Sequence, residues 1–177
     1  IFMGYSDVTA FLTSITQKTG LVTFHGPMLS SFSKGMVDYN FDLIEKTFFK
    51  YESITIQAPR ELQCRVLKPG KTEGPLWGGN MCLLVNRFGT ADQLSTNGTI
   101  LFIEDIDEYL YAFERMMIHM KETGMFENIR GHVILHFENR SFHQDRPQKF
   151  RLKYLNIASK RTQREKRLHP CKAVVYL

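Results

Sequence analysis

The opening stretch IFMGYSDVTAFLTSITQKTGLVTFHGPM, residues 1–28, decides the fold class. Residues 1–3 are typical of the end of a buried strand, and the glycine-containing segment 4–7 is typical of a sharp turn. A helix is expected over about 8–18, because apolar residues recur there at helical spacing. These residues are Val8, Phe11, Leu12 and Ile15.

The second half of this stretch completes the pattern. Gly20 follows the expected helix as a C-terminal stop. A short strand over 21–24 then runs into the turn formed by residues 25–27. Strand, tight turn, helix and strand in this order predict an α/β protein. Because the chain starts within a strand, we expect it to lack an N-terminal portion.

The rest of the chain continues the alternation, after a Ser-rich loop expected over 29–35. Further helices are expected over 41–49, 81–88 and 109–123. Further strands are expected over 54–58, 65–68, 99–103 and 133–137. In the helix over 109–123, Leu110, Phe113, Met117 and Met120 are predicted to share the buried face, with Asp107 as a cap.

Composition places the chain among globular proteins. It has 177 residues, of which 43% are hydrophobic and 23% charged, enough for one ordinary domain or two small ones. No apolar run approaches the roughly 18 residues of a membrane span, and no export signal is visible. The three cysteines, Cys64, Cys82 and Cys171, are scattered, which disfavours a disulfide framework and favours a reducing compartment, the cytoplasm.

The formal net charge of +5 is unevenly distributed. Residues 1–138 hold 12 Lys and Arg against 16 Asp and Glu, a balance of −4; residues 139–177 hold 11 against 2, a balance of +9. The basic tail has no nucleic-acid-binding motif, and a charge run is usually a solvated face. We therefore expect no nucleic-acid partner and no membrane partner.

Ser6 is the first candidate catalytic residue. It lies in a Gly-x-Ser-Asp turn between a strand and a helix, the context of a nucleophile elbow, although the second glycine of G-x-S-x-G is missing. In that context the helix N-terminus offers backbone N–H groups to an oxyanion. The alternative is that Ser6 or Asp7 is only the N-cap of the following helix.

Glu104 is the second candidate, because it ends a buried strand where an open α/β sheet presents catalytic side chains. A carboxylate there can orient a histidine that acts as base for a serine. The alternative is an acidic first turn of the helix over 109–123, which explains the neighbouring acidic residues better than Glu104. No His or Cys lies at ligand spacing nearby, so neither a metal nor another cofactor is expected.

The remaining candidate residues are more typical of structural roles. The histidines are His25, His119, His132, His136, His143 and His169. Without partners each is expected to be structural, and only proximity in space would make one catalytic. Gly78, Gly79 and Asn80 precede a helix but lack the P-loop and dinucleotide-binding patterns, so close backbone packing is the favoured interpretation.

Five segments in order make the sequence resemble the LD-carboxypeptidase family of serine peptidases, which includes muramoyltetrapeptide carboxypeptidases and microcin C immunity peptidases. The segments are GYSDVTA, GLVTFHGPM, GKTEGPLWGGNMCLL, ILFIEDIDEYLYAFERMM and TGMFENIRGHVIL. The resemblance covers roughly residues 1–138. Some segments are closer to the microcin branch and IDEYLYAFERM is closer to the murein branch.

The resemblance implies a fold in which a Rossmann-like N-terminal α/β domain is followed by a C-terminal mixed α/β domain. We expect the C-terminal part of the first domain over 1–35, a linker over 36–60, the second domain over 61–138 and a divergent basic tail over 139–177. The resemblance also implies a homodimer and a small peptide substrate, either murein tetrapeptide or a peptide-nucleotide.

The resemblance assigns roles to four groups. Ser6 is the nucleophile, Glu104 orients the histidine, and the backbone N–H of Asp7 forms half of the oxyanion hole. His169 corresponds to the general base by its distance from the C-terminus, but the Gly-His and Pro-Leu-Gly motifs of the family are missing around it. A frame shift or a divergent tail would each explain that ending. The expected activity is release of D-alanine from murein tetrapeptide; the alternatives are microcin-type cleavage and a catalytically inactive fragment.

Overall fold

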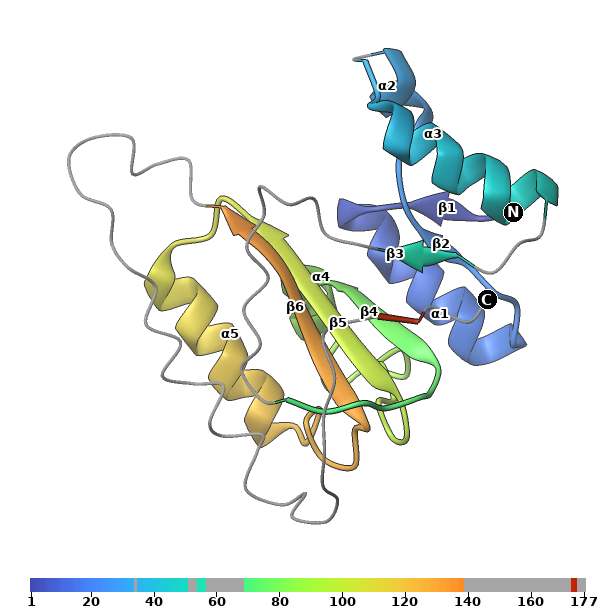
Figure 1. Ribbon diagram of the computed structural model, residues 1–177. Coiled ribbons are helices and arrows are strands. Elements are labelled where there is room, and N and C mark those ends of the chain that lie inside the picture. The colour runs from blue at the N-terminus through green and yellow to red at the C-terminus, as the bar shows by residue number, and fades with distance from the viewer. Residues whose placement is uncertain (34, 51–53, 57–68, 139–172, 175–177) are drawn as a thin grey trace.

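The computed structural model describes residues 1–33, 35–50, 54–56, 69–138 and 173–174. Within these ranges the chain is a mixed α/β protein with mainly parallel strand pairing (Figure 1). β1 (Met3–Gly4) pairs with β2 (Phe24–His25) in parallel. A parallel sheet has the order β4 (Leu76–Asn80), β5 (Ile100–Ile106) and β6 (Gly131–Glu138). The α/β class predicted from the sequence is confirmed.

The N-terminal stretch forms the predicted strand, turn, helix and strand. A 3₁₀ turn η1 (Ser6–Val8) leads into α1 (Thr9–Thr19), which ends at Gly20 in the left-handed conformation (φ 73°). The expected buried face is only partly right, because Phe11 is 69% exposed. α1 instead buries Thr9, Leu12 and Thr13, which lie at i, i+3 and i+4 on one face. Burial of the strand start was also wrong: Ile1 and Phe2 are exposed.

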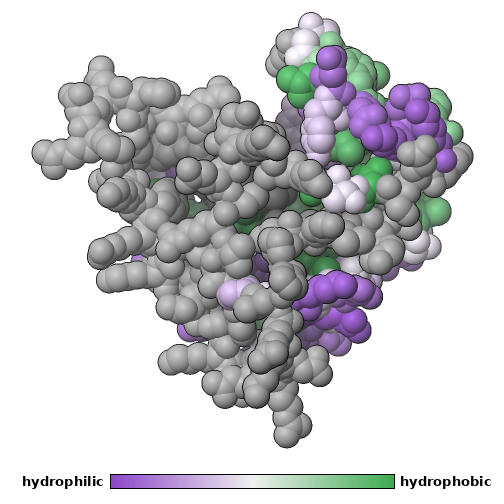
Figure 2. Space-filling model, viewed as in Figure 1, coloured by the Kyte–Doolittle hydropathy of each residue, from purple (hydrophilic) through white to green (hydrophobic). Residues whose placement is uncertain are grey.

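The segment after β2 is more helical than expected. α2 (Leu29–Ser33) occupies the expected loop, and α3 (Asp38–Glu45) continues into a π-helical turn η2 (Lys46–Lys50). Several apolar side chains of these elements are exposed, and Figure 2 shows hydrophobic colour over this part of the molecule. β3 (Thr55–Ile56) pairs antiparallel with β7 (Ala173–Val174). The strand expected over 65–68 and nearly all of the basic tail lie outside the described residues.

The strand β4 was missed by the sequence analysis, which placed its two glycines only as residues before a helix. Gly78 pairs with Phe102 on β5, and a Cβ atom on Gly78 would lie 1.8 Å from the Phe102 carbonyl oxygen. A Cβ on Gly79 would lie 2.5 Å from Thr9 Cγ2 of α1. The glycines therefore serve close backbone packing, as expected, and they do so within a strand.

The hydrophobic core lies between the three-stranded sheet and two helices, α4 (Met81–Asn86) and α5 (Leu110–Glu122). Its buried members include Met81, Leu84, Leu101, Ile103, Phe113, Met117 and Met120. Leu110, predicted to share this face, is about half exposed. The predicted Asp107 cap is wrong as well, because Tyr109 occupies the N-cap position of α5 without a side-chain cap bond.

Helix α1 connects the N-terminal stretch to this core. Gln17 Nε2 donates to the Gln93 carbonyl oxygen at 3.0 Å, and its Oε1 accepts from the Ser95 N–H at 2.8 Å. Arg87 Nη2 donates to Ser14 Oγ at 2.7 Å. The beginning of the chain is thus held against the end of α4 and the segment that follows it, 73 to 78 residues later. The four-part division of the chain stays a prediction.

Candidate active site

Ser6 has the backbone conformation of a nucleophile elbow. Its φ is 56°, a left-handed value that is uncommon outside glycine and that costs energy. It lies two residues after the end of β1, begins η1 and precedes α1, and it is exposed. The N-cap positions of η1 and α1 are Tyr5 and Val8, and neither makes a side-chain cap bond. The alternative that Ser6 or Asp7 acts as an N-cap is therefore wrong.

Gly4 explains how the sequence makes this turn. A Cβ at Gly4 would lie 2.6 Å from Cγ1 of Val8, closer than real Cβ atoms approach their neighbours. The chain therefore doubles back over Gly4 within four residues, and the serine is placed at the tip of the turn. The backbone N–H of Val8 donates to the Tyr5 carbonyl oxygen at 3.2 Å and closes the turn. The glycine two residues before the serine is the local requirement for the elbow.

Glu104 lies near the C-terminal end of β5, where it pairs in register with Asn80 at the end of β4. Its side chain is mostly buried, and Oε1 lies 3.8 Å from Nε2 of His25. His25 ends β2 and is the register partner of Gly4, two residues before Ser6. The carboxyl ends of strands from two sheets thus bring the elbow, His25 and Glu104 to the same side of the molecule.

His25 is the residue that the sequence analysis left among structural histidines. Burial lowers the pKa of its imidazole, so the neutral form is favoured near pH 7. The distance of 3.8 Å between His25 Nε2 and Glu104 Oε1 is too long for a hydrogen bond. Because the imidazole is neutral near pH 7, the two side chains do not form a charged pair there. The ring packs edge-on against Phe102 of β5, with centroids 5.2 Å apart. Nothing in the spacing of the sequence signals this pairing, because 79 residues separate the two side chains.

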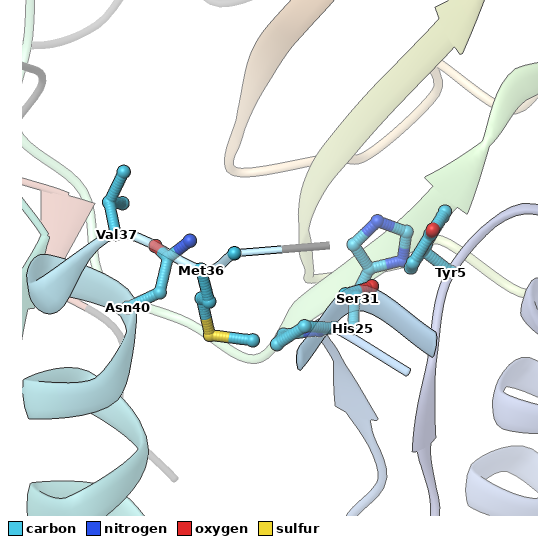
Figure 3. A pocket seen from close by; sticks show the side chains of 9 residues that line it. Tyr5, His25, Ser31, Met36, Val37 and Asn40 are labelled. Carbon is cyan, nitrogen blue, oxygen red and sulfur yellow. The ribbon is translucent and has the colours of Figure 1, made fainter. Parts of the chain in front are cut away.

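A cavity of about 440 Å³ opens beside the elbow. Figure 3 shows that its lining comes from several elements: Tyr5 precedes Ser6, His25 ends β2, Ser31 belongs to α2 and Asn40 to α3. Met36 adds an apolar wall. Because Tyr5 is adjacent to Ser6 in the chain, a molecule in this cavity would lie next to the elbow.

Of the other histidines, His119 and His132 lie apart from this arrangement, whereas His136 lies on β6 where the pairing with β5 shifts beside Glu104. His119 of α5 packs edge-on against Phe88 at 4.8 Å, a contact within the helical layer. His132 lies on β6 opposite Leu101, toward the start of that strand. His143 and His169 are outside the described residues, so the general base expected at His169 stays a prediction.

The acidic segment divides into different environments. Asp105 is buried and accepts a hydrogen bond from the Cys82 N–H in the first turn of α4. The alternative interpretation, in which the acidic segment serves the first turn of α5, therefore does not hold for Asp105. Burial raises the pKa of the Glu108 carboxyl, and Asp105 raises it further. Burial also raises the pKa of the Cys82 thiol, with further contributions from Asp105, Glu108 and Asp7.

In the part of the chain that the structure describes, no group of three or more His, Cys, Asp or Glu side chains is arranged to hold a metal ion. No helix in the described ranges is long and apolar enough to cross a membrane.

A left-handed serine between a strand and a helix, with a carboxylate at the end of a nearby parallel strand, is typical of α/β hydrolytic enzymes with a serine nucleophile. Residues 1–26 match the LD-carboxypeptidase N-terminal domain, and residues 73–169 match the LD-carboxypeptidase C-terminal domain. The chain belongs to the LD-carboxypeptidase family of serine carboxypeptidases. The second matched range extends past residue 138, where the sequence analysis placed the end of the resemblance, and it includes His169.

Curated relatives come from both branches of the family. The chain is 42% identical over 142 residues to the probable murein peptide carboxypeptidase of Bacillus subtilis, covering 78% of this chain and 44% of that protein. It is 32% identical over 163 residues to the microcin C7 self-immunity protein MccF of Escherichia coli, covering 76% and 47%. The chain therefore spans less than half the length of these relatives.

Solved structures lead to the same family. The muramoyltetrapeptide carboxypeptidase of Oxalobacter formigenes superimposes with a TM-score of 0.66 at 32% identity, over 77% of this chain and 46% of that one. MccF in complex with glutamyl sulfamoyl guanosine also gives a TM-score of 0.66, at 27% identity, over 83% and 52%. The two branches are equally similar in structure.

Proposed function

We propose that the chain carries the nucleophile and the carboxylate of a serine LD-carboxypeptidase that releases the terminal D-alanine of murein tetrapeptide. The observation that carries the proposal is the left-handed backbone of Ser6 at the turn between β1 and α1. A strained serine at such a turn has its hydroxyl clear of the sheet and next to backbone N–H groups. The 42% identity to a relative named for murein peptides favours this substrate.

In the proposed reaction, Ser6 Oγ attacks the carbonyl carbon of the bond between the L-centre and D-alanine. A histidine takes the hydroxyl proton, and the backbone N–H of Asp7 donates to the oxyanion that forms. When the intermediate collapses, the carbon–nitrogen bond breaks and the protonated histidine gives its proton to the amine of D-alanine. Water then hydrolyses the acyl ester, with the same histidine as base, and Ser6 regains its proton.

The histidine in this scheme is His169, and Glu104 holds it in the productive tautomer. Its inclusion in the range that matches the family domain supports this assignment. His25 is close to Glu104, but its approach distance of 3.8 Å and the lowered pKa of its imidazole favour a neutral packing partner of the carboxylate. The proposed mechanism uses no metal and no organic cofactor.

A second candidate function is hydrolysis of the amide bond in a peptide-nucleotide, as in microcin immunity. The similarity to MccF favours it, because MccF has been solved with aspartyl sulfamoyl adenosine and with glutamyl sulfamoyl guanosine. The chemistry at Ser6 would be the same, and only the group on either side of the amide would differ. We place the enzyme in the cytoplasm, with a role in peptidoglycan recycling. It acts there as a homodimer, and it binds neither nucleic acid nor membrane.

The test is substrate turnover with and without the nucleophile. We expect the chain to release D-alanine from murein tetrapeptide and Ser6→Ala to lower the rate by at least about 10³-fold. Ser33→Ala is the matched control, because Ser33 Oγ only donates to the Ser30 carbonyl oxygen within exposed α2. Turnover that survives Ser6→Ala contradicts the assignment. No turnover of either substrate class by the wild-type chain supports the third reading, a catalytically inactive fragment.

A further inference from the structure

A chain of buried polar groups joins the helix of the elbow to the strand of Glu104. The backbone N–H of Asn80 donates to Thr9 Oγ1 at 3.1 Å, and Asn80 Nδ2 donates to Asp105 Oδ1 at 3.0 Å. The three residues are 1%, 5% and 4% exposed, in chain order. Thr9 is the first residue of α1, immediately after η1, and Asp105 immediately follows Glu104. The two ends of the buried chain therefore border the two parts of the candidate site.

We propose that Thr9 and Asp105 are positioning residues: through Asn80 they fix the distance between the Ser6 elbow and the strand that carries Glu104. The proposal rests on the function proposed above, in which Ser6 and Glu104 belong to one catalytic apparatus. Neither positioning residue is proposed to contact the substrate. Both act through the backbone to which the catalytic side chains are attached.

The contact at Thr9 leaves no room for sliding. Gly79 packs so closely on it that a Cβ atom would lie 2.5 Å from Thr9 Cγ2 and 2.8 Å from Oγ1. The hydroxyl accepts from the next residue of β4, so α1 is held by shape and by a directional bond at one point. A hydrogen bond in this buried setting depends strongly on distance and angle. Helix α1 therefore has one permitted position along the end of β4.

The contact at Asp105 holds the strand where its pairing is irregular. The register between β5 and β6 shifts between Ile103 and Asp105, which places Glu104 at the shift. Irregular pairing of this kind re-aims side chains and occurs next to active sites. Asp105 stabilises the irregular backbone by accepting from three donors: Asn80 Nδ2 at 3.0 Å, the Cys82 N–H at 2.9 Å and the Ile106 N–H at 2.9 Å. The direction of Glu104 thus depends on the carboxylate beside it.

The first measurement asks whether the two ends are energetically coupled. Thr9→Val removes the hydroxyl acceptor and keeps the shape of the side chain. Asp105→Asn also keeps the shape, but it replaces one accepting oxygen with an NH₂ group that points at an N–H donor. We expect the double variant to depart from additivity by about fivefold or more in the unfolding equilibrium constant, since residues in one network couple. Each change combined with Thr96→Val should be additive within about twofold. Thr96 is equally buried, but its hydroxyl donates to the Met125 carbonyl oxygen outside this network.

The second measurement separates positioning from stability. We expect Asp105→Asn to lower kcat for D-alanine release by roughly 10- to 100-fold and to leave KM within about twofold, because a misplaced group loses the reactive geometry. The rate of Ser6 phosphonylation by a fluorophosphonate should fall by the same factor. Thr9→Val should act in the same direction and Thr9→Ser, which keeps the hydroxyl, should recover most of the rate. Thr96→Val should leave both rates unchanged after a similar loss of stability.

Three outcomes are informative in different ways. Additive effects of Thr9→Val and Asp105→Asn on unfolding overturn the proposal. Equal losses of rate in Asp105→Asn and Thr96→Val also overturn it, because a general loss of stability then explains both. If the wild-type chain releases no D-alanine, the function proposed above fails for this chain; the unfolding cycle and the phosphonylation rates still decide the positioning, since neither uses that substrate.

Discussion

Gly78→Ala is the substitution whose effect the structure determines most sharply. Gly78 lies on β4 opposite Phe102 with φ 150°, a backbone region that side-chain-bearing residues rarely adopt. The new Cβ would lie 1.8 Å from the Phe102 carbonyl oxygen, 2.7 Å from its carbon and 2.9 Å from its nitrogen. Carbon–oxygen contacts rarely fall below about 3.3 Å, so β4 and β5 would have to separate by roughly 1.5 Å. All three obstacles are backbone atoms, and no side chain can turn away to relieve them.

The expected loss follows from what that separation breaks. Two ladder hydrogen bonds around the pair contribute about 0.5–1.5 kcal/mol each, and leaving their buried groups unpaired costs a further 1–3 kcal/mol. Backbone strain adds about 1–3 kcal/mol. We expect Gly78→Ala to lower the free energy of unfolding by about 4 kcal/mol or more. Few kinds of substitution destabilise a protein this much, and one of them is a clash in a packed interior.

The control is Gly89→Ala, in the turn that follows α4. Gly89 also has a positive φ, 76°, but a Cβ there would meet nothing within 4 Å. The left-handed conformation alone costs about 1–2 kcal/mol. Urea unfolding followed by the fluorescence of Trp77, the single tryptophan, measures both variants. If Gly78→Ala unfolds within about 1 kcal/mol of Gly89→Ala, the argument from close approach is wrong; a Gly78→Ala chain that is insoluble while Gly89→Ala is soluble agrees with it.

Further predictions concern titrating groups. Cys82 should be alkylated by iodoacetamide with a pH midpoint above that of a free cysteine, because burial and nearby carboxylates raise the thiol pKa. Glu108→Gln should lower that midpoint, and an unchanged midpoint would exclude the contribution of Glu108. His25 should titrate below pH 6.5 by NMR, because burial lowers its pKa. As the pH falls below about 6.5 the unfolded chain binds the proton first, so this residue then reduces the stability of the folded chain. A midpoint above 6.5 would show that the nearby Glu104 carboxylate outweighs burial. Hydrogen bonding from Lys18 lowers the pKa of the Asp92 carboxyl, so its stabilisation is present above the unfolded pKa and is lost as pH falls through the folded one. Asp92→Asn should therefore be less stable than wild type at pH 7 and equal to it at low pH in urea unfolding, and a difference that does not change with pH would contradict this.

Local signals in the sequence predicted most of the elements. The helix of the elbow, its stop at Gly20 and the long helix over 110–122 follow from periodicity within a few turns of chain. β4 was missed because strands are recognised by β-branched and apolar residues, and this one holds two glycines. Its identity as a strand depends on Phe102 and Thr9, which approach its backbone from distant segments. The exposed position of Phe11 has the same cause, since the face that α1 buries is chosen by its partner.

The candidate site divides in the same way. Ser6 and Glu104 were found from their neighbours in sequence, a turn before a helix and an acidic residue at the end of an apolar strand. His25 and Asp105 were not singled out for the roles that the structure suggests. The contact of His25 with Glu104 requires two separate sheets to meet at their carboxyl ends. The role of Asp105 requires α4 to begin beside β5, where its N–H groups need an acceptor.

The sequence by itself determined the α/β class, the family and the chemical character of the elbow, because each depends on residues that are close together in the chain. The division of charge between an acidic body and a basic tail was also readable there. Only the tertiary structure decided which face of α1 is buried, that two glycines form a strand, and that Thr9, Asn80 and Asp105 form one buried network. Those features depend on contacts between segments some 25 to 78 residues apart, and no local pattern of residues encodes which distant backbone will arrive to complete them.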